Sequence, residues 1–268
     1  MEKLSLEQVG NNQWLFVWPK ISEKATDIFY EALDYAESGK FTKVKELLNK
    51  ALKIFPEHID VLHHLSMLAD NEKEATNLNE KAVNIGLSVF PKEFNEKSKL
   101  EWGWTENRPF LRAYHNRGLI ALNNGNIEET IKLFNQIISW NPNDNQGARD
   151  ILADIYVQNE KWNEMIDLSN KYPGDCDPSM NFGLALAFYK KGEKEKATKE
   201  LKTAINRFPL CGKILLEKNP KKPKSVMPGY ITYGGEDQAY EFWKEQGRFW
   251  QEEEIKKWLE SVLDLKNK

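Results

Sequence analysis

Apolar residues return at spacings of three and four along most of the chain, a pattern that predicts amphipathic helices. Within this pattern a longer motif recurs, in which a Gly is followed by apolar or small residues and then by a Pro. Its clearest copies run from Gly39 to Pro56, from Gly125 to Pro142 and from Gly192 to Pro209, with identical internal spacing. In the third copy Lys194 takes an apolar position. A period of about thirty-four residues indicates stacked supersecondary units.

Each unit is predicted to be a pair of helices joined by a turn. The Gly tolerates the positive φ that a tight turn needs, and the Pro ends the second helix. Small residues such as Ala197 and Ala204 let the two helices approach closely. One pair cannot bury its apolar face alone, so neighbouring units are expected to complete one another's core.

This motif resembles the tetratricopeptide repeat (TPR) family. The resemblance is good over 25–56, 111–142 and 178–209, and 59–91 and 146–173 read as degenerate copies. It implies an all-α, right-handed superhelical solenoid of about five TPR-like helix pairs with capping segments at both ends. The predicted domain plan is a capping segment at 1–24, repeats at 25–58, 59–91, 111–144, 145–177 and 178–209, an insertion at 92–110, and a loop plus helical cap at 210–268.

Two segments outside the repeats carry patterns of their own. Trp14, Phe16 and Trp18 alternate, which favours an extended segment with one apolar face. We expect it to cover the exposed core of the first repeat, and an aromatic docking element is the alternative. Near the other end, 218–235 is rich in Lys, Pro and Gly and predicts a loop. The ranges 236–246 and 252–265 predict helices that cap the last repeat or meet a partner.

The insertion at 92–110 interrupts the repeats and is both polar and aromatic. Insertions in repeat proteins often map to a binding face, so Trp102, Trp104 and Arg108 are possible anchors at the rim of a binding surface. The alternative is that the two Trp fill a gap between mismatched repeats while Arg108 pairs with a Glu.

Composition narrows the classes of function. The 268 residues carry a net charge of −3, which disfavours non-specific binding to nucleic acid. Cys176 and Cys211 are the only cysteines, which suits a reducing compartment. The sequence has no apolar run long enough to span a membrane and no apolar signal-peptide core near Met1. We therefore expect a cytoplasmic protein without a membrane partner.

Signals for catalysis are weak. The chain lacks the phosphate-binding, zinc-protease and nucleophile-elbow motifs, so no catalytic residue, cofactor or metal is predicted. His63, His115 and Asp150 fall at corresponding repeat positions and could bind a metal. Adjacent first helices lie about 10 Å apart, however, which is far for one ion. An enzyme or metal-dependent protein with a site near Trp102–His115 is the alternative function.

In the TPR family the first helix of each pair lines a concave groove, and this register predicts the partner-binding residues. They are His63, Met67, Arg112, His115, Asn116, Asn123, Asp150, Asp154, Phe182 and Tyr189. Asn116 resembles a groove asparagine of peptide-binding members.

The predicted function is a non-catalytic scaffold or adaptor that binds a peptide or helix of a partner protein. Members of the family that clamp a C-terminal carboxylate use Lys and Arg where this chain has Phe29, Leu33, Ser179 and Gly183, so that mode is not expected. RNA binding through the lysines at 218, 221, 222 and 224 is the weaker alternative. The partner and the oligomeric state stay open.

Overall fold

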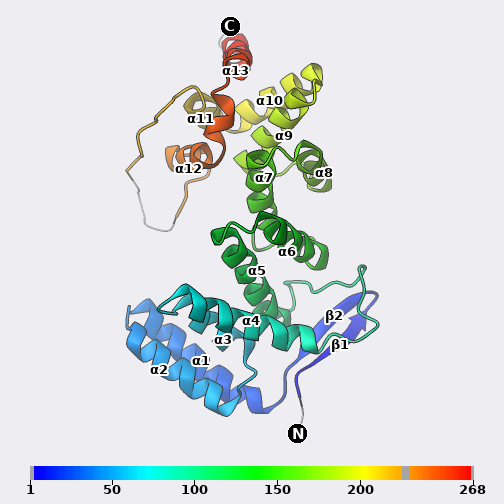
Figure 1. The fold of residues 1–268 in the computed structure, drawn as a ribbon, viewed down its shortest axis with the longest axis vertical. Coiled ribbons are helices and arrows are strands. Elements are labelled where there is room, and N and C mark those ends of the chain that lie inside the picture. Colours follow the sequence, from blue (N-terminus) through cyan, green and yellow to red (C-terminus); the bar gives the residue numbers. More distant parts are fainter. Residues whose placement is uncertain (1–2, 225–229, 267–268) are drawn as a thin grey trace. The chain divides into compact units, whose positions relative to one another are not determined.

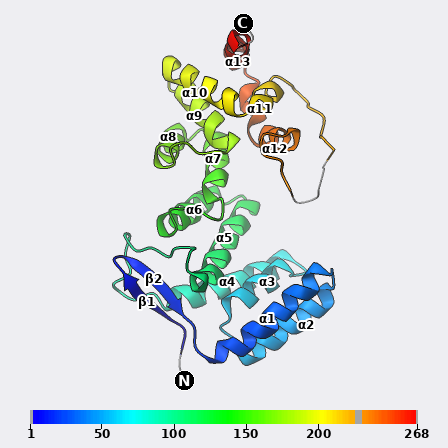
Figure 2. The same ribbon diagram turned by 180° about the vertical axis from the view of Figure 1, so that it is seen from behind.

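The protein is described by a computed structural model that covers residues 3–224 and 230–266 (Figures 1 and 2). The chain forms two compact units, Met1–Ala148 and Arg149–Lys268. Both are built from consecutive helix pairs, and the described residues add one β-hairpin. The predicted fold class, in which consecutive helix pairs make up the body of the chain, is confirmed.

The N-terminal unit begins with the hairpin and continues as three helix pairs. Strands β1 (Ser5–Gly10) and β2 (Gln13–Val17) are antiparallel. The pairs are α1 (Ile21–Glu37) with α2 (Phe41–Ile54), α3 (Ile59–Met67) with α4 (Glu72–Ser88), and α5 (Arg108–Asn123) with α6 (Ile127–Trp140). The insertion between α4 and α5 holds one short 3-10 helix, η1 (Thr105–Asn107).

The C-terminal unit holds two further pairs and a terminal segment. The pairs are α7 (Ala148–Gln158) with α8 (Trp162–Lys171), and α9 (Pro178–Lys190) with α10 (Lys194–Arg207). Helix α11 (Pro209–Ile214) follows, then an extended stretch. The chain ends with α12 (Glu236–Gln246), the 3-10 helix η2 (Gly247–Trp250) and α13 (Glu253–Lys266). Helix α12 contacts α9 and α11, and α13 contacts α10.

Turn chemistry explains where the first helices end. Gly39, Gly125 and Gly192 have φ values of 69°, 73° and 81°, the conformation that glycine adopts without a Cβ clash. In the fourth pair Glu160 occupies the same place with a φ of 54°. Because the turn geometry is kept there without glycine, that turn is strained.

The hairpin packs mainly against the insertion rather than over the first repeat. Phe16 is fully buried, with ring centroids 5.2 Å from Phe110 and 6.3 Å from Phe90. Trp14 contacts Phe94 at 5.6 Å. Only Trp18 packs against the core of the first repeat. The prediction that this segment covers the core of the first repeat is therefore corrected. The insertion forms no long helix, so the hairpin supplies the surface that buries the aromatic side chains around it.

Candidate functional site

A buried amide joins the hairpin to the insertion. Asn107 accepts a hydrogen bond from the Phe16 N–H at 3.1 Å and donates to the Trp14 carbonyl at 3.0 Å. Its side chain therefore satisfies backbone groups along β2 that would otherwise be buried without partners. The sequence did not single out this residue, because its partners lie about ninety positions away.

The three predicted rim anchors have different surroundings. The Arg108 Nε donates to the Trp102 carbonyl at 3.0 Å, and its guanidinium lies 5.4 Å from the Trp102 ring centroid. The Arg112 guanidinium lies 5.8 Å from the same ring. Trp104 is 42% exposed. Because Trp104 is exposed, it does not fill a gap between repeats, whereas Trp102 is half-buried and both interpretations of it stay predictions.

On the first helices of the N-terminal unit, polar side chains pair across neighbouring repeats. Arg112 on α5 forms a two-point ion pair with Asp60 on α3, with an Nε to Oδ1 distance of 2.9 Å. Asn116 donates to the Ser66 hydroxyl at 3.0 Å. Met67, which is 64% exposed, and the exposed Asn123 face solvent. The positions of Arg112 and Asn116 are therefore fixed by these contacts. We use the term first-helix face for the surface formed by Asp60, Ser66 and Met67 of α3 and Arg112, Asn116 and Asn123 of α5.

Burial favours the neutral form of three histidines in this unit, His58, His63 and His115. The His58 Nδ1 accepts from the Val61 N–H as the N-cap of α3, so its Nε2–H donates to Thr26, 3.1 Å away. Burial lowers the pKa of His58 to about 4 and that of His63 to about 3. Burial also lowers the pKa of His115, whose ring lies 5.2 Å from Phe134.

Within the described ranges no group of three His, Cys, Asp or Glu side chains is placed to hold a metal ion. Asp150, the third residue of the metal alternative, lies in the C-terminal unit.

A pocket of about 340 Å³ opens beside this face in the N-terminal unit. Helices α1, α3 and α5, the 3-10 helix η1 and Trp18, the residue after β2, form its walls. Its lining comprises Trp18, Ser22, Glu23, Thr26, Asp27, Phe29 and Tyr30, then His58 and Asp60, and finally Thr105, Glu106, Pro109 and Arg112. The pocket thus combines aromatic rings, carboxylates and one paired guanidinium. Of the predicted groove residues, only Arg112 reaches it.

In the C-terminal unit the chain's own terminal residues cover the first helices. The Gln246 amide of α12 donates to Asp154 Oδ1 of α7 at 2.9 Å and to the Ser179 carbonyl of α9 at 3.2 Å. Gln158 of α7 donates to the Glu245 carboxylate at 3.0 Å. We call residues 236–264 the terminal segment.

The predicted aromatic residues of this unit lie beneath the terminal segment. Phe182 is fully buried, with ring centroids 5.1 Å from Phe242 and 5.8 Å from Trp250. Tyr189 stacks on Trp258 at 4.4 Å, and the Lys194 ammonium lies 4.0 Å from the Tyr189 ring centroid. These two positions therefore bind the chain itself in this structure.

Burial also shifts the acids of the C-terminal unit. It raises the pKa of Asp154 to about 7, although the side chains of Ser179 and Gln246 hydrogen-bond the carboxylate and oppose the shift. The pKa of Asp177 is raised for the same reason. The protonated form of Asp154 is thus favoured in the folded unit below about pH 7.

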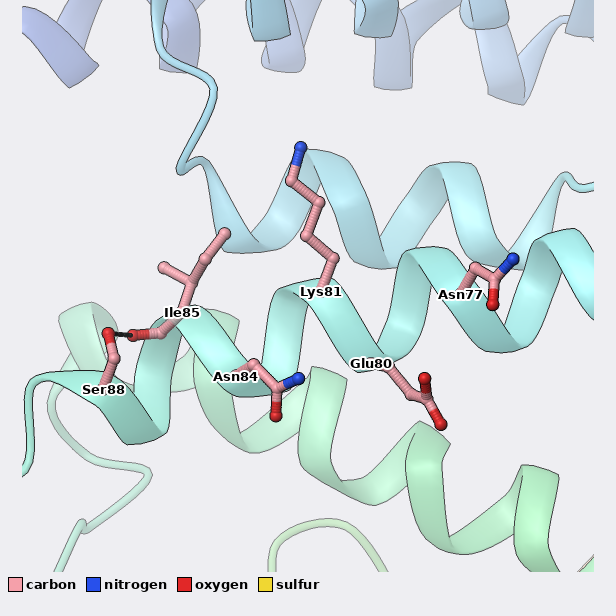
Figure 3. Close-up of a pocket in the computed structure, with 6 residues that line it drawn as sticks. All are labelled: Asn77, Glu80, Lys81, Asn84, Ile85 and Ser88. Atoms are coloured by element: carbon pink, nitrogen blue, oxygen red, sulfur yellow. Dashed lines mark hydrogen bonds between the residues drawn. The ribbon is translucent and has the colours of Figure 1, made fainter.

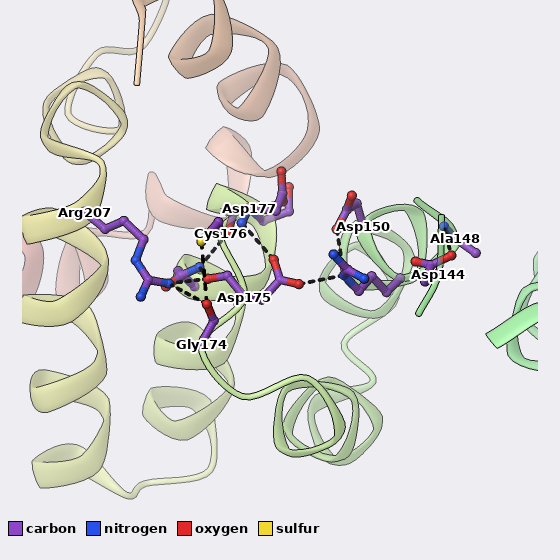
Figure 4. Close-up of polar contacts among 11 residues, drawn as sticks. Asp144, Ala148, Asp150, Gly174, Asp175, Cys176, Asp177 and Arg207 are labelled. Atoms are coloured by element: carbon purple, nitrogen blue, oxygen red, sulfur yellow. Dashed lines mark hydrogen bonds and ion pairs between the residues drawn. The ribbon is translucent and has the colours of Figure 1, made fainter. Parts of the chain in front are cut away.

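Asp150 belongs to a polar network around the turn before α9. Its Oδ1 lies 3.8 Å from the Arg149 Nε, which also pairs with Asp175 at 2.6 Å. Figure 4 shows Arg207 on the other side of this turn, where it donates to the Gly174 and Asp175 carbonyls. The network fixes the turn between α8 and α9.

A shallow depression on α4 is lined by one helix alone, and Figure 3 shows one hydrogen bond among its labelled residues, from the Ser88 hydroxyl to the Ile85 carbonyl at 2.7 Å. The lysines at 218, 221, 222 and 224 are exposed along the extended stretch after α11. Within the described residues, no helix has the length and apolar character needed to cross a membrane.

Three solved structures of similar fold share low sequence identity with the chain. YrrB, described as a TPR protein with an unusual peptide-binding site, is 14% identical with a TM-score of 0.47, covering 71% of this chain and 93% of its own. A putative kinesin light chain from Podosopora anserina is 17% identical with a TM-score of 0.48. The match covers 75% of this chain and 100% of that chain. The structure of Naa15/Naa10 bound to HypK-THB is 16% identical with a TM-score of 0.47. The match covers 90% of this chain and 34% of that chain.

Sequence comparison identifies the family. None of the curated proteins matches the chain at a significant level. The profile of the Tcf25 family, described as "Transcriptional repressor TCF25", matches residues 29–268, which include all five helix pairs except the start of α1, together with the terminal segment. The chain therefore belongs to the Tcf25 family.

Proposed function

We propose that this protein is a non-catalytic interaction module that binds a segment of a partner protein along the first-helix face of its N-terminal unit. The pocket beside that face is the observation that carries the proposal. Tyr30 at the pocket is 61% exposed and Met67 on α3 is 64% exposed, so large apolar side chains are available to a partner. The fixed Arg112 and Asn116 reduce the ordering cost of binding.

The C-terminal unit supports this choice of surface by contrast. Its corresponding positions, Asp154, Phe182 and Tyr189, already contact the terminal segment. A partner that used them would first have to displace buried aromatic contacts. The N-terminal face needs no such displacement.

The family description sets the cellular context of the proposal. Members are described as transcriptional repressors, so we propose that the partner belongs to the transcription machinery. That context favours the nucleus over the cytoplasm predicted from composition.

Site-specific photocrosslinking tests this surface. A photoreactive phenylalanine analogue would replace Tyr30 or Met67, with the exposed Asn84 of α4 as the matched control (Figure 3). The expected result is one partner crosslinked from both test positions and not from Asn84. Crosslinking from Asn84 alone, or equally from all three, would refute the proposed surface. Parallel nuclease treatment tests the RNA alternative, because a partner bound through RNA would then be lost.

A further inference from the structure

The pocket of the N-terminal unit has walls of a particular chemistry. On α1 its lining side chains are spaced by three and four residues, Glu23, Asp27 and Tyr30, so they share one helical face. Glu106 of η1 and Arg112 of α5 line it from other elements, and His58 and Asp60 come from the start of α3. The cavity therefore has carboxylates on more than one wall.

The charges of the lining residues leave a net negative pocket. Arg112 is matched by Asp60 through their two-point ion pair. His58 is neutral at pH 7, because burial lowers its pKa. Glu23, Asp27 and Glu106 remain, and all three residues are exposed. Lys20 and Lys24 also lie on or beside α1 but do not line the pocket.

Aromatic rings supply the remaining recognition surface. Trp18 is half-buried, with its ring 5.9 Å from His58 and its indole N–H donating to the Glu106 carbonyl at 3.0 Å. Phe29 lies 5.6 Å from Tyr30. Aromatic faces and carboxylates together attract a cation, through the ring quadrupole and through charge-assisted hydrogen bonds.

We propose that this pocket receives a basic side chain, Arg or Lys, from the partner segment. The inference rests on the proposed function and adds the chemistry of the ligand to it. A cation would also relieve the repulsion between Glu23 and Asp27, since like charges four residues apart on a helix are unfavourable. A volume of about 340 Å³ accommodates one long side chain and excludes a folded element.

A small-molecule probe tests the pocket independently of the partner. Nα-acetyl-arginine amide would be titrated into the isotope-labelled full chain, with amide chemical shifts followed by NMR. Nα-acetyl-citrulline amide is the matched neutral probe, because it keeps the shape of arginine and lacks its charge. We expect saturable shifts confined to the pocket residues, with the citrulline probe binding about five- to tenfold more weakly.

Two matched variants assign the effect to the carboxylates. Glu23→Gln with Asp27→Asn is expected to weaken arginine binding by about five- to tenfold. Asp34→Asn with Glu37→Gln changes the same charge at exposed positions of α1 outside the pocket, and should leave binding unchanged. Tyr30→Leu should weaken binding by about two- to fivefold through loss of the exposed ring.

The outcomes separate the two proposals. Equal binding of the arginine and citrulline probes, or equal weakening by both charge variants, would overturn the basic-side-chain inference. If a partner still crosslinks from Met67 in that case, the proposed function stands without it. If arginine binds the pocket but no partner crosslinks there, the pocket chemistry holds and the proposed function fails.

Discussion

Both units are built from helix pairs of the same kind, but the surface of the first helices is covered to a different extent in each. In the N-terminal unit that face is fixed by internal polar pairs such as Arg112 with Asp60, and its Met67 remains exposed on the same unit as a pocket. In the C-terminal unit it lies under the terminal segment, where Phe182 is fully buried. A repeat backbone therefore does not by itself decide whether its surface is available to a partner; the segments outside the repeats decide it.

The largest expected difference between the units concerns two tryptophans. Trp250 is fully buried against Phe182 and Trp258, whereas Trp104 is 42% exposed. Trp250→Ala is expected to lower the free energy of unfolding by about 3–5 kcal/mol, because it leaves a large cavity. Trp104→Ala should change it by about 0.5 kcal/mol or less. Urea denaturation measures both, and equal losses would contradict the contrast.

Hydrogen exchange in the same two variants locates the effect. Trp250→Ala should accelerate exchange in α12 and α13 while α1 and α2 keep their protection.

The two units should also respond oppositely to pH. The pKa of His58 is lowered from 6.5 to about 4, so its folded environment favours the neutral form. The contribution of neutral His58 to the free energy of unfolding is complete above pH 6.5. It is lost as pH falls towards 4, by an amount on the order of a few kcal/mol. The pKa of Asp154 is raised from 3.8 to about 7, so the stability it contributes is present at low pH and is lost as pH rises towards 7.

Hydrogen exchange across pH 4–7.5, corrected for intrinsic rates, checks these slopes. Peptides from α3 should lose protection on acidification, and peptides from α7 and α12 should gain it. His58→Asn keeps an N-cap side chain and should reduce the first slope, leaving the part that His63 contributes. Asp154→Asn should flatten the second. The same slope in both units would be inconsistent with the two burial environments.

Buried amides give a third comparison, of intermediate size. Asn107 uses both its carbonyl oxygen and its NH₂ group on backbone partners. Gln246 uses only its NH₂ group, and its Oε1 has no hydrogen-bond partner among the described residues. Asn107→Ala should therefore cost about 2–3 kcal/mol and Gln246→Ala about 1–2 kcal/mol. Thermal and urea unfolding of the two variants would show the order, and the reverse order would contradict this account.

The smallest expected effect tests the turns. Glu160 adopts a φ of 54° where Gly125 adopts 73°. Glu160→Gly should stabilise the protein by about 0.5–1 kcal/mol, because glycine relieves the strain but raises the entropy of the unfolded chain. Gly125→Ala should destabilise it by about 1 kcal/mol. If both substitutions destabilise, the strain at Glu160 is relieved by other contacts.

Local features of the fold followed from the sequence alone. The positive φ of Gly39, Gly125 and Gly192 and the helix at 236–246 were predicted, and the structure has them at those positions. Apolar periodicity and turn chemistry depend on residues within about four positions of one another, so a single sequence shows them. The positions of Arg112 and Asn116 on a first helix came from the same register.

Only the tertiary structure decided which elements pack against one another. The docking of Phe16 on Phe110, the burial of Phe182 beneath Trp250 and the pairing of Arg112 with Asp60 join residues from 52 to 94 positions apart. The sequence determined that amphipathic faces and polar groups existed and that they needed partners. It did not determine the partners, because many apolar faces could satisfy the same burial, and the choice among them is made by shape and hydrogen-bond geometry across the whole unit.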